Sequence, residues 1–389
     1  MTRVLVVDDS PFMRTVISNA LTTAGYDVET ATNGSEAIEA AAAYDPDVIT
    51  MDVEMPEMDG IDAVERIMAT NPALILMLSV HTDRGTEATL DALERGAVDF
   101  LHKPDGSDSR TVTHLSSDIV EKVDELADAN ASSVALARAA ASVHATRSSQ
   151  PNGAVATVAE IGGETQTEPA QCEPTGPDFE TTTEPGVEDE RADNPTVVIG
   201  ASTGGPKIIE ELFERLPIDL GAKILIVQHM PAEFTERFAQ RLDSRSEYDI
   251  REAVDGDLIR SGEAAVAPGD AHLEVTTNVG GLLRVRLDDG ERIHGVRPAI
   301  DVTMQTAAEQ VDDRLCGVAL TGMGADGAAG IEAIKTAGGH TIAQDEATSP
   351  VFGIPYQAIQ TGCVDAVVPA TKLVETIVDA FNTDGETDD

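Results

Sequence analysis

The chain has 389 residues, enough for two domains that each bury a core of their own. It carries 70 acidic residues against 26 basic ones, and this net charge of −44 would repel nucleic acid and anionic lipid. The three cysteines show no CxxC spacing, which argues against a disulfide framework or a zinc site. We interpret the acidity as adaptation of the whole surface to high salt.

Hydrophobic stretches in this sequence are short. The longest, residues 73–80 and 224–227, fall well below the roughly 18–20 residues that a membrane helix needs. We expect no signal peptide, because Met1 is followed almost directly by a predicted strand. The sequence therefore predicts a cytoplasmic protein without direct membrane insertion.

Short β-branched runs alternate with helical patterns over the first 125 residues. Strands are predicted at residues 4–7, 28–30, 48–51, 74–78 and 98–101. Strands separated by helices indicate a parallel sheet covered on both faces. Five such units predict a flavodoxin-like (βα)5 domain, followed by an alanine-rich helical stretch over residues 111–141.

Composition changes sharply between residues 146 and 194, where Glu, Thr, Pro, Gly and Ser dominate. We predict a disordered acidic linker there, and we divide the chain into residues 1–125, 126–194 and 195–389. The last part returns to alternating strands and helices, with strands at 197–199, 224–227, 315–320 and 341–343. It is predicted to be a doubly wound, mainly parallel α/β domain with a small β-rich insertion at residues 249–286.

Three aspartates follow strands of the first predicted sheet. Asp8 and Asp9 follow the first strand, and Asp52 follows the third, so their carboxylates should meet in the crevice at the carboxyl ends of the strands. Such a cluster suits Mg²⁺. Ser79 and Lys103, at the ends of the fourth and fifth strands, should face the same crevice. A nucleophilic carboxylate beside cations is what phosphoryl transfer needs.

With these residues, the first part of the chain resembles the receiver family of response regulators. The resemblance covers residues 1 to about 125 and rests on the segments Asp8-Asp9, 52–60, Ser79, Phe100 and Lys103-Pro104. It implies that Asp52 is the phosphoacceptor and that Phe100 is the switch aromatic. The implied Mg²⁺ ligands are Asp9, Asp52 and the Glu54 carbonyl, with Asp8 nearby. The implied phosphoryl contacts are Ser79 and Lys103.

Three strand-end turns carry the chemistry of the second domain. Ser202 lies in a GxSxG turn between a strand and a helix, where backbone amides can form an oxyanion hole. His229 follows the next buried strand, and Asp326 follows the strand at 315–320. Because strand ends meet at one edge, these residues supply a nucleophile, a base and an orienting carboxylate. Their order differs from the Ser, Asp, His order of α/β-hydrolases.

Two nucleotide-binding alternatives concern the same turns. Residues 200–207 superficially suggest a Walker loop, but Pro206 precedes Lys207 and no Ser or Thr follows, so we reject that alternative. Residues 322–327 fit GxGxxG, with Asp345 where a ribose-binding acid would lie. Against this, Asp326 would set a carboxylate beside the pyrophosphate at the helix N-terminus.

The second domain resembles the catalytic domain of the chemotaxis protein-glutamate methylesterases, the CheB family. The resemblance covers residues 195–381 and rests on segments 200–206, 228–231, 267–269 and 320–327. It implies that Ser202 is the nucleophile, His229 the general base and Asp326 its orienting residue, with the backbone amides of Thr203 and Met323 as oxyanion donors. Ala325 replaces a common asparagine, and the linker is unusually long and acidic.

The resemblance implies phosphorylation-regulated hydrolysis of glutamate γ-methyl esters on methyl-accepting chemoreceptors, with glutamine deamidation as a second activity. The phosphodonor would be a phosphorylated chemotaxis histidine kinase. Mg²⁺ would serve phosphorylation, and hydrolysis would need no cofactor. Two alternatives are a receiver joined to a non-catalytic module that acts as a phosphate sink or receptor adaptor, and a DNA-binding output, which the acidic charge disfavours.

Overall fold

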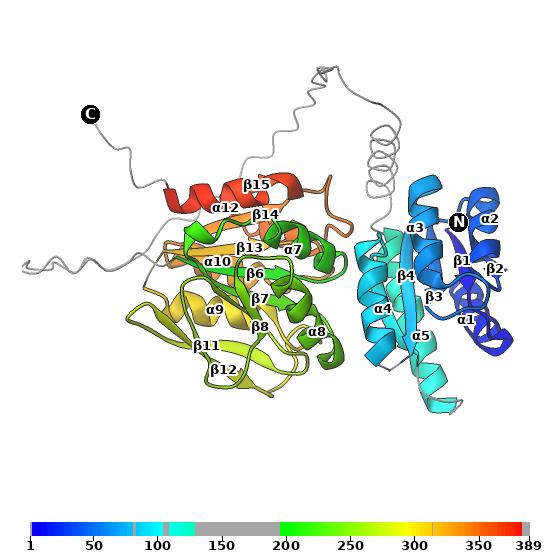
Figure 1. The fold of residues 1–389 in the computed structure, drawn as a ribbon, viewed down its shortest axis with the longest axis horizontal. Helices are drawn as coiled ribbons and strands as arrows, with labels where there is room; N and C mark the ends of the chain where they lie inside the picture. The colour runs from blue at the N-terminus through cyan, green and yellow to red at the C-terminus, as the bar shows by residue number, and fades with distance from the viewer. Residues whose placement is uncertain (1, 81–82, 104–108, 129–194, 313, 383–389) are drawn as a thin grey trace, which may run out of the picture.

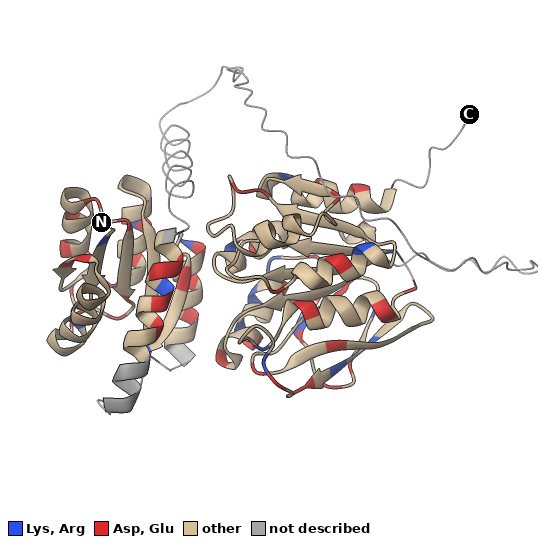
Figure 2. Ribbon diagram, turned by 180° about the vertical axis from the view of Figure 1, so that it is seen from behind, with Lys and Arg blue, Asp and Glu red and all other residues tan. Residues whose placement is uncertain are grey.

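The computed structural model describes residues 2–80, 83–103, 109–128, 195–312 and 314–382, which form two α/β units (Figure 1). The predicted linker and the end of the predicted helical extension, residues 129–194, lie outside the described residues. Acidic positions are spread over the helices of both units (Figure 2). Across the described ranges, no helix combines the length and the apolar run that a bilayer crossing requires.

The first unit is a parallel sheet with the strand order β2-β1-β3-β4-β5. Its strands are β1 (Arg3–Val7), β2 (Asp27–Ala31), β3 (Val48–Asp52), β4 (Leu74–Val80) and β5 (Asp99–Lys103). Its helices are α1 (Pro11–Ala24), α2 (Gly34–Tyr44), α3 (Gly60–Thr70), α4 (Asp83–Glu94) and α5 (Ser109–Asp128). Helix α1 packs against α5, whereas α2, α3 and α4 form a second row. This strand order confirms the predicted flavodoxin-like fold.

Burial and capping in the first unit follow from its sequence. All residues of β3 are buried, as expected for a central strand of a sheet covered on both faces. Ser10, Asn33 and Asp59 precede α1, α2 and α3, and each side chain accepts a hydrogen bond from the backbone N–H three residues later. These caps set where the helices begin, at the edge of the sheet that carries Asp8 and Asp52.

The second unit contains a parallel sheet of order β15-β14-β13-β6-β7-β10-β8 and an antiparallel sheet of order β11-β12-β9. The large sheet consists of β6 (Thr196–Ala201), β7 (Lys223–Gln228), β8 (Asp249–Glu252), β10 (Glu263–Val266), β13 (Leu315–Ala319), β14 (His340–Gln344) and β15 (Ala366–Val368). The small sheet consists of β9 (Leu258–Ile259), β11 (His272–Val279) and β12 (Leu282–Asp288). The helices are α7 (Gly205–Phe213), α8 (Ala232–Asp243), α9 (Ile300–Gln310), α10 (Ala328–Thr336), α11 (Ile354–Gln360) and α12 (Leu373–Asn382).

The doubly wound, mainly parallel fold predicted for this unit is confirmed, with one refinement. Strands from residues 249–286 divide between the two sheets: β8 and β10 extend the large parallel sheet beyond β7, and β9, β11 and β12 form the small one. Short runs of this kind do not reveal their pairing partners in sequence. Strand β15 was not predicted, because its three residues are only partly covered and form no buried apolar run.

The two units contact each other through α4 and β5 of the first and α7 and α8 of the second (Figure 1). The rings of Phe100 on β5 and Phe234 on α8 lie 4.2 Å apart, centroid to centroid. Such a pair typically contributes about 0.5–1.5 kcal/mol beyond the apolar area it buries. The aromatic residue predicted to be a switch therefore lies buried between the units.

Candidate functional site

The acidic cluster of the first unit lies where its strand order reverses. In this fold ligands bind outside the carboxyl ends of β1 and β3, which carry Asp8, Asp9 and Asp52. One carboxylate oxygen from each of the three lies within 4.8 Å of those from the other two. Lys103, at the end of β5, brings its Nζ to 2.7 Å from both Asp8 Oδ2 and Asp52 Oδ1. Four of the predicted residues are therefore gathered in one crevice.

The electrostatics of this crevice favour a bound cation. Burial raises the pKa of Asp52 to about 6; the Lys103 charge opposes that rise, and Asp8 and Asp9 add to it. Three carboxylates against one ammonium leave an excess of negative charge, which a hard divalent cation with oxygen ligands would balance. The donor set of Asp8, Asp9 and Asp52 therefore fits Mg²⁺.

Two further predicted residues of the first site have different surroundings. Ser79 is buried at the end of β4, and its hydroxyl donates a hydrogen bond to the Gly85 carbonyl oxygen over 3.2 Å. Glu54 is exposed in the loop after β3. Gly60 closes that loop against β3, where a β-carbon would clash with the Asp52 carbonyl. The loop can thus return close to Asp52 only with glycine at this position.

The second unit brings Ser202, His229 and Asp326 to one edge of its large sheet. Strand order reverses between β6 and β13; Ser202 follows β6, and the Asp326 loop follows β13. His229 follows β7, the other neighbour of β6. Backbone hydrogen bonds fix these turns, since Ser202 N donates to Thr321 O over 3.0 Å and His229 N to Ala201 O over 3.1 Å.

Close packing beside Ser202 requires a glycine. Gly322 has a φ of +154°, and a β-carbon there would lie 2.6 Å from Ser202 Cβ. Any larger residue would therefore push the β13 loop away from the serine. Ser202 itself is 8% exposed. Within the described part of the chain, its hydroxyl makes no hydrogen bond, so it is available to a substrate or to the histidine.

The histidine and the aspartate are in direct contact. His229 Nε2 lies 2.8 Å from Asp326 Oδ2, and Asp326 is buried. Burial acts to raise the pKa of Asp326, but the hydrogen bond and charge of His229, with the N–H groups of Asp301 and Ile300, outweigh it and hold that pKa below its ordinary value. Asp326 therefore stays ionised at neutral pH and can orient His229.

Two residues that support this site were not predicted. The Gln228 side-chain amide donates to Ser202 O over 2.9 Å and to His229 O over 3.2 Å, so it joins the two turns. Its position next to His229, at a strand end, was the available signal. Asp301 binds the loop of Asp326 from the N-terminus of α9. No motif around Asp301 in the sequence indicated this.

The first unit lies directly on the serine turn. Gly204 N donates to Val98 O over 2.7 Å, and the Thr203 hydroxyl donates to Asp99 Oδ2 over 2.6 Å. Lys122 Nζ on α5 lies 3.3 Å from the same hydroxyl and 2.9 Å from Asp99. The Thr203 and Met323 N–H groups, predicted as oxyanion donors, make no hydrogen bond within the described ranges.

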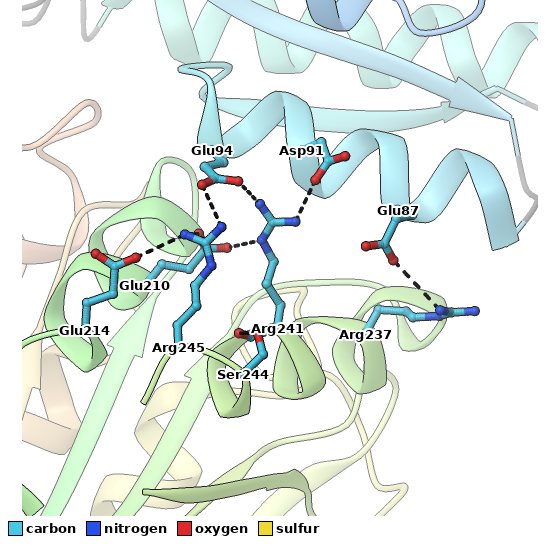
Figure 3. A network of polar contacts seen from close by, with 9 residues as sticks. All are labelled: Glu87, Asp91, Glu94, Glu210, Glu214, Arg237, Arg241, Ser244 and Arg245. Atoms are coloured by element: carbon cyan, nitrogen blue, oxygen red, sulfur yellow. Dashed lines mark hydrogen bonds and ion pairs between the residues drawn. The ribbon is translucent and has the colours of Figure 1, made fainter. Parts of the chain in front are cut away.

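Two arginines at the C-terminal end of α8, Arg241 in its last turn and Arg245 just beyond it, bind the acidic helix α4 (Figure 3). Arg241 pairs with Asp91 over 2.7 Å and with Glu94, and Arg245 pairs with Glu94 over 2.6 Å. Arg241 also pairs with the buried Glu210 of α7 over 2.9 Å, so its charge is matched on both sides of the contact. These ion pairs hold the two units in the arrangement that covers Ser202.

The dinucleotide alternative is disfavoured by the start of α10. Gly327 N and Gly330 N, which would face a pyrophosphate, already donate to Asp301 Oδ1 over 2.8 and 2.7 Å. Asp345, the proposed ribose ligand, accepts hydrogen bonds from Thr348 instead. His294, Asp301 and Asp326 lie close enough to share a metal ion, but the carboxylates of both aspartates already accept backbone N–H groups.

Each of the two units matches a known protein family. Residues 197–377 match the CheB methylesterase family, and residues 4–113 match the response regulator receiver domain. A protein-glutamate methylesterase/protein-glutamine glutaminase of Halobacterium salinarum is 49% identical, covering 98% of this chain and 99% of that protein. One of Pyrococcus horikoshii is 42% identical, covering 97% and 93%. The solved catalytic domain of Thermotoga maritima CheB methylesterase is 42% identical with a TM-score of 0.46, covering 48% of this chain and 98% of that one.

Proposed function

Because the chain belongs to the CheB family of protein-glutamate methylesterases/protein-glutamine glutaminases, we propose that it hydrolyses glutamate γ-methyl esters on chemoreceptors. Deamidation of receptor glutamines to glutamate is its second activity. The observation that carries the proposal is the 2.8 Å contact between His229 and the buried Asp326, at the sheet edge that also presents Ser202. Adaptation in chemotaxis is the process it serves.

The reaction begins with Ser202 as nucleophile. Nε2 of His229 is occupied by Asp326, so Nδ1 is the ring nitrogen that takes the Ser202 proton as the hydroxyl attacks the ester carbonyl. The N–H groups of Thr203 and Met323 stabilise the oxyanion, which is worth roughly 10²–10³-fold for one donor. His229 then protonates the departing methanol or ammonia. Water, activated by the same base, releases the glutamate product from Ser202.

The first unit acts as the receiver. Asp52 accepts a phosphoryl group from a phosphorylated chemotaxis histidine kinase, while Lys103 neutralises charge on the transferred oxygens. Asp9, Asp52 and the Glu54 carbonyl would hold Mg²⁺, which would supply further positive charge beside the transferred group. Ser79 turns from the Gly85 carbonyl to the phosphoryl group. Hydrolysis at Ser202 itself requires no cofactor.

Regulation follows from the position of the receiver on the serine turn. Val98 and Asp99 accept hydrogen bonds from Gly204 and Thr203, so a receptor cannot reach Ser202 while these contacts hold. Phosphorylation of Asp52 pulls on Lys103 at the far end of β5 and weakens the contact between the units. The active enzyme is the form in which the receiver has moved away.

The domain limits remain part of the proposal: a receiver over residues 1–125, a helical extension and acidic linker over 126–194, and a catalytic domain over 195–389. They are supported by the family matches over residues 4–113 and 197–377. The proposed phosphodonor and substrate would be met in the cytoplasm, so the cytoplasmic location belongs to the same proposal. The relative from Halobacterium salinarum is consistent with adaptation of the acidic surface to salt.

The test is methanol release from methylated receptors of the same cell by the full chain and by Ser202→Ala. We expect release to fall to background in the variant, because alanine at this position carries no oxygen that can attack the ester carbonyl. Release at the normal rate would refute the mechanism. Labelling by a serine-directed phosphonate separates the adaptor alternative: an enzyme is labelled at Ser202, whereas a non-catalytic phosphate sink is not.

A further inference from the structure

Helices α9 and α10 begin without a cap from their own preceding residue. The N-cap of α9 is Ala299 and that of α10 is Gly327, and neither has a side chain that can accept a hydrogen bond. The first N–H groups of a helix need acceptors, above all when they are buried. In this chain, the acceptor for the start of each helix is an aspartate at the start of the other helix.

The proposed triad aspartate caps α9. Asp326 Oδ2 accepts from Ile300 N over 2.7 Å, and Oδ1 accepts from Asp301 N over 2.9 Å. The same Oδ2 binds His229 Nε2. The position of Asp326 relative to the histidine therefore depends on how the start of α9 lies against its loop.

Asp301 in turn caps α10. Its Oδ1 accepts from Gly327 N over 2.8 Å and from Gly330 N over 2.7 Å, and the residue is buried. Gly327 directly follows Asp326 in the chain, so this oxygen fixes the backbone one residue from the triad carboxylate. The capping is thus reciprocal. Asp326 caps α9, which carries Asp301, and Asp301 caps α10, which begins just after Asp326.

We propose that Asp301 is a positioning residue for the reaction, acting through Asp326; the inference rests on the proposed function and deepens it. Without the Asp301 carboxylate, two buried N–H groups lose their acceptor and the loop of Asp326 is no longer held from both sides. A displacement of about 1 Å in a catalytic constellation costs on the order of 10²-fold in rate. Asp301 is buried, so we expect the loss to fall on kcat and not on KM.

His294 is a lesser contributor to this arrangement. Its Nε2 lies 2.9 Å from Asp301 Oδ2, the oxygen that does not bind α10, and its side chain is 44% exposed. The capping of α10 uses only Asp301 Oδ1. The variant that isolates the cap is therefore Asp301→Ala, with Asp301→Asn as the conservative change that keeps an oxygen acceptor.

The experiment measures kcat and KM for methanol release by the phosphorylated full chain. Asp301→Ala is expected to lower kcat by roughly 10–100-fold with KM unchanged, and Asp301→Asn to recover most of it. Asp365→Ala serves as the control, because Asp365, just before the edge strand β15, also accepts hydrogen bonds from a backbone N–H and a hydroxyl, those of Thr341 on β14. It should lower the unfolding temperature and leave kcat intact.

A double-mutant cycle separates positioning from general damage. If Asp301 acts through Asp326, adding Asp301→Ala to Asp326→Ala should cost little further activity; additive losses, or an unchanged kcat in the single variant, would overturn the proposal. The rate of Ser202 labelling by a serine-directed phosphonate gives a second readout, independent of the natural substrate. If the proposed substrate is wrong, Asp301→Ala should still be labelled more slowly than the wild type. If Asp301 does not position Asp326, the variant should be labelled at the wild-type rate.

Discussion

The Thr203 hydroxyl donates a hydrogen bond to Asp99 Oδ2 over 2.6 Å, which attaches the residue beside Ser202 to the first residue of β5. The last residue of the same strand, Lys103, lies 2.7 Å from Asp52 Oδ1. One strand of five residues, about 13 Å long, therefore contacts both Asp52, the proposed phosphoacceptor, and the serine turn. This gives the coupling between the two sites a physical path despite the long linker.

Loosening the ion pairs between the units should raise the activity of the unphosphorylated enzyme. Glu94→Gln removes the carboxylate that pairs with both Arg241 and Arg245, and it leaves the pairing of Arg241 with Glu210 in place. Partly buried pairs of this kind are worth about 1 kcal/mol, so basal methanol release should rise about fivefold.

Glu87→Gln is the matched control for that prediction. Glu87 also lies on α4 and faces an arginine of α8, but its distance to Arg237 is 3.8 Å and both side chains are largely exposed (Figure 3). Its loss should leave basal release unchanged within error. Equal effects of the two substitutions, or no effect of Glu94→Gln, would contradict the role of this contact in inhibition.

Replacing the triad carboxylate should reduce turnover without abolishing binding. Asp326→Asn keeps the size of the side chain but removes the charge that orients His229. By analogy with serine hydrolases, kcat should fall roughly 10³–10⁴-fold. Measuring kcat and KM of the phosphorylated variant checks this, and a loss of less than tenfold would argue that Asp326 is not the orienting residue.

The raised pKa of Asp52 predicts a pH-dependent stability of the receiver in the absence of Mg²⁺. The folded pKa is about 6 and the ordinary value is 3.8, so between about pH 4 and 6 the folded state holds a proton that the unfolded chain has lost. The free energy of unfolding should therefore fall as pH rises through this window, by an amount on the order of 3 kcal/mol.

Asp52→Asn removes that dependence. Calorimetry should find the receiver transition of the variant above that of the wild type at pH 7.5 and equal to it near pH 4, because the neutral amide has no proton to lose. Added Mg²⁺ should stabilise the wild type above pH 6 much more than the variant. If the difference in transition temperature between the two proteins does not depend on pH, the charge of Asp52 is not the cause of the lower stability.

Strand periodicity carried most of the fold prediction. Buried parallel strands such as β3 and β7 are mainly apolar, and their short apolar runs can be recognised in the sequence. The pairing of β8 and β10 with the large sheet could not be predicted, because β10 pairs with β7 and β8 with β10, and four-residue runs do not encode these contacts.

The candidate sites were predictable to the extent that they follow strands. Ser202, His229 and Asp326 each come directly after, or in the loop after, a strand of one sheet, so topology alone brings them together. Asp301 lies at a helix start, where an aspartate normally reads as a local cap. In the structure, Asp301 on α9 instead accepts hydrogen bonds from backbone N–H groups at the start of α10. Only the packing of α9 against α10 reveals this.

The most direct test measures methanol release from methylated receptors by the full chain, with and without a small-molecule phosphodonor, beside Asp52→Asn and Ser202→Ala. Our account predicts release that rises on phosphorylation in the wild type, stays at the basal rate in Asp52→Asn and is absent from Ser202→Ala under both conditions. Release that is the same with and without phosphodonor, or that persists in Ser202→Ala, would contradict a Ser202 methylesterase controlled from Asp52.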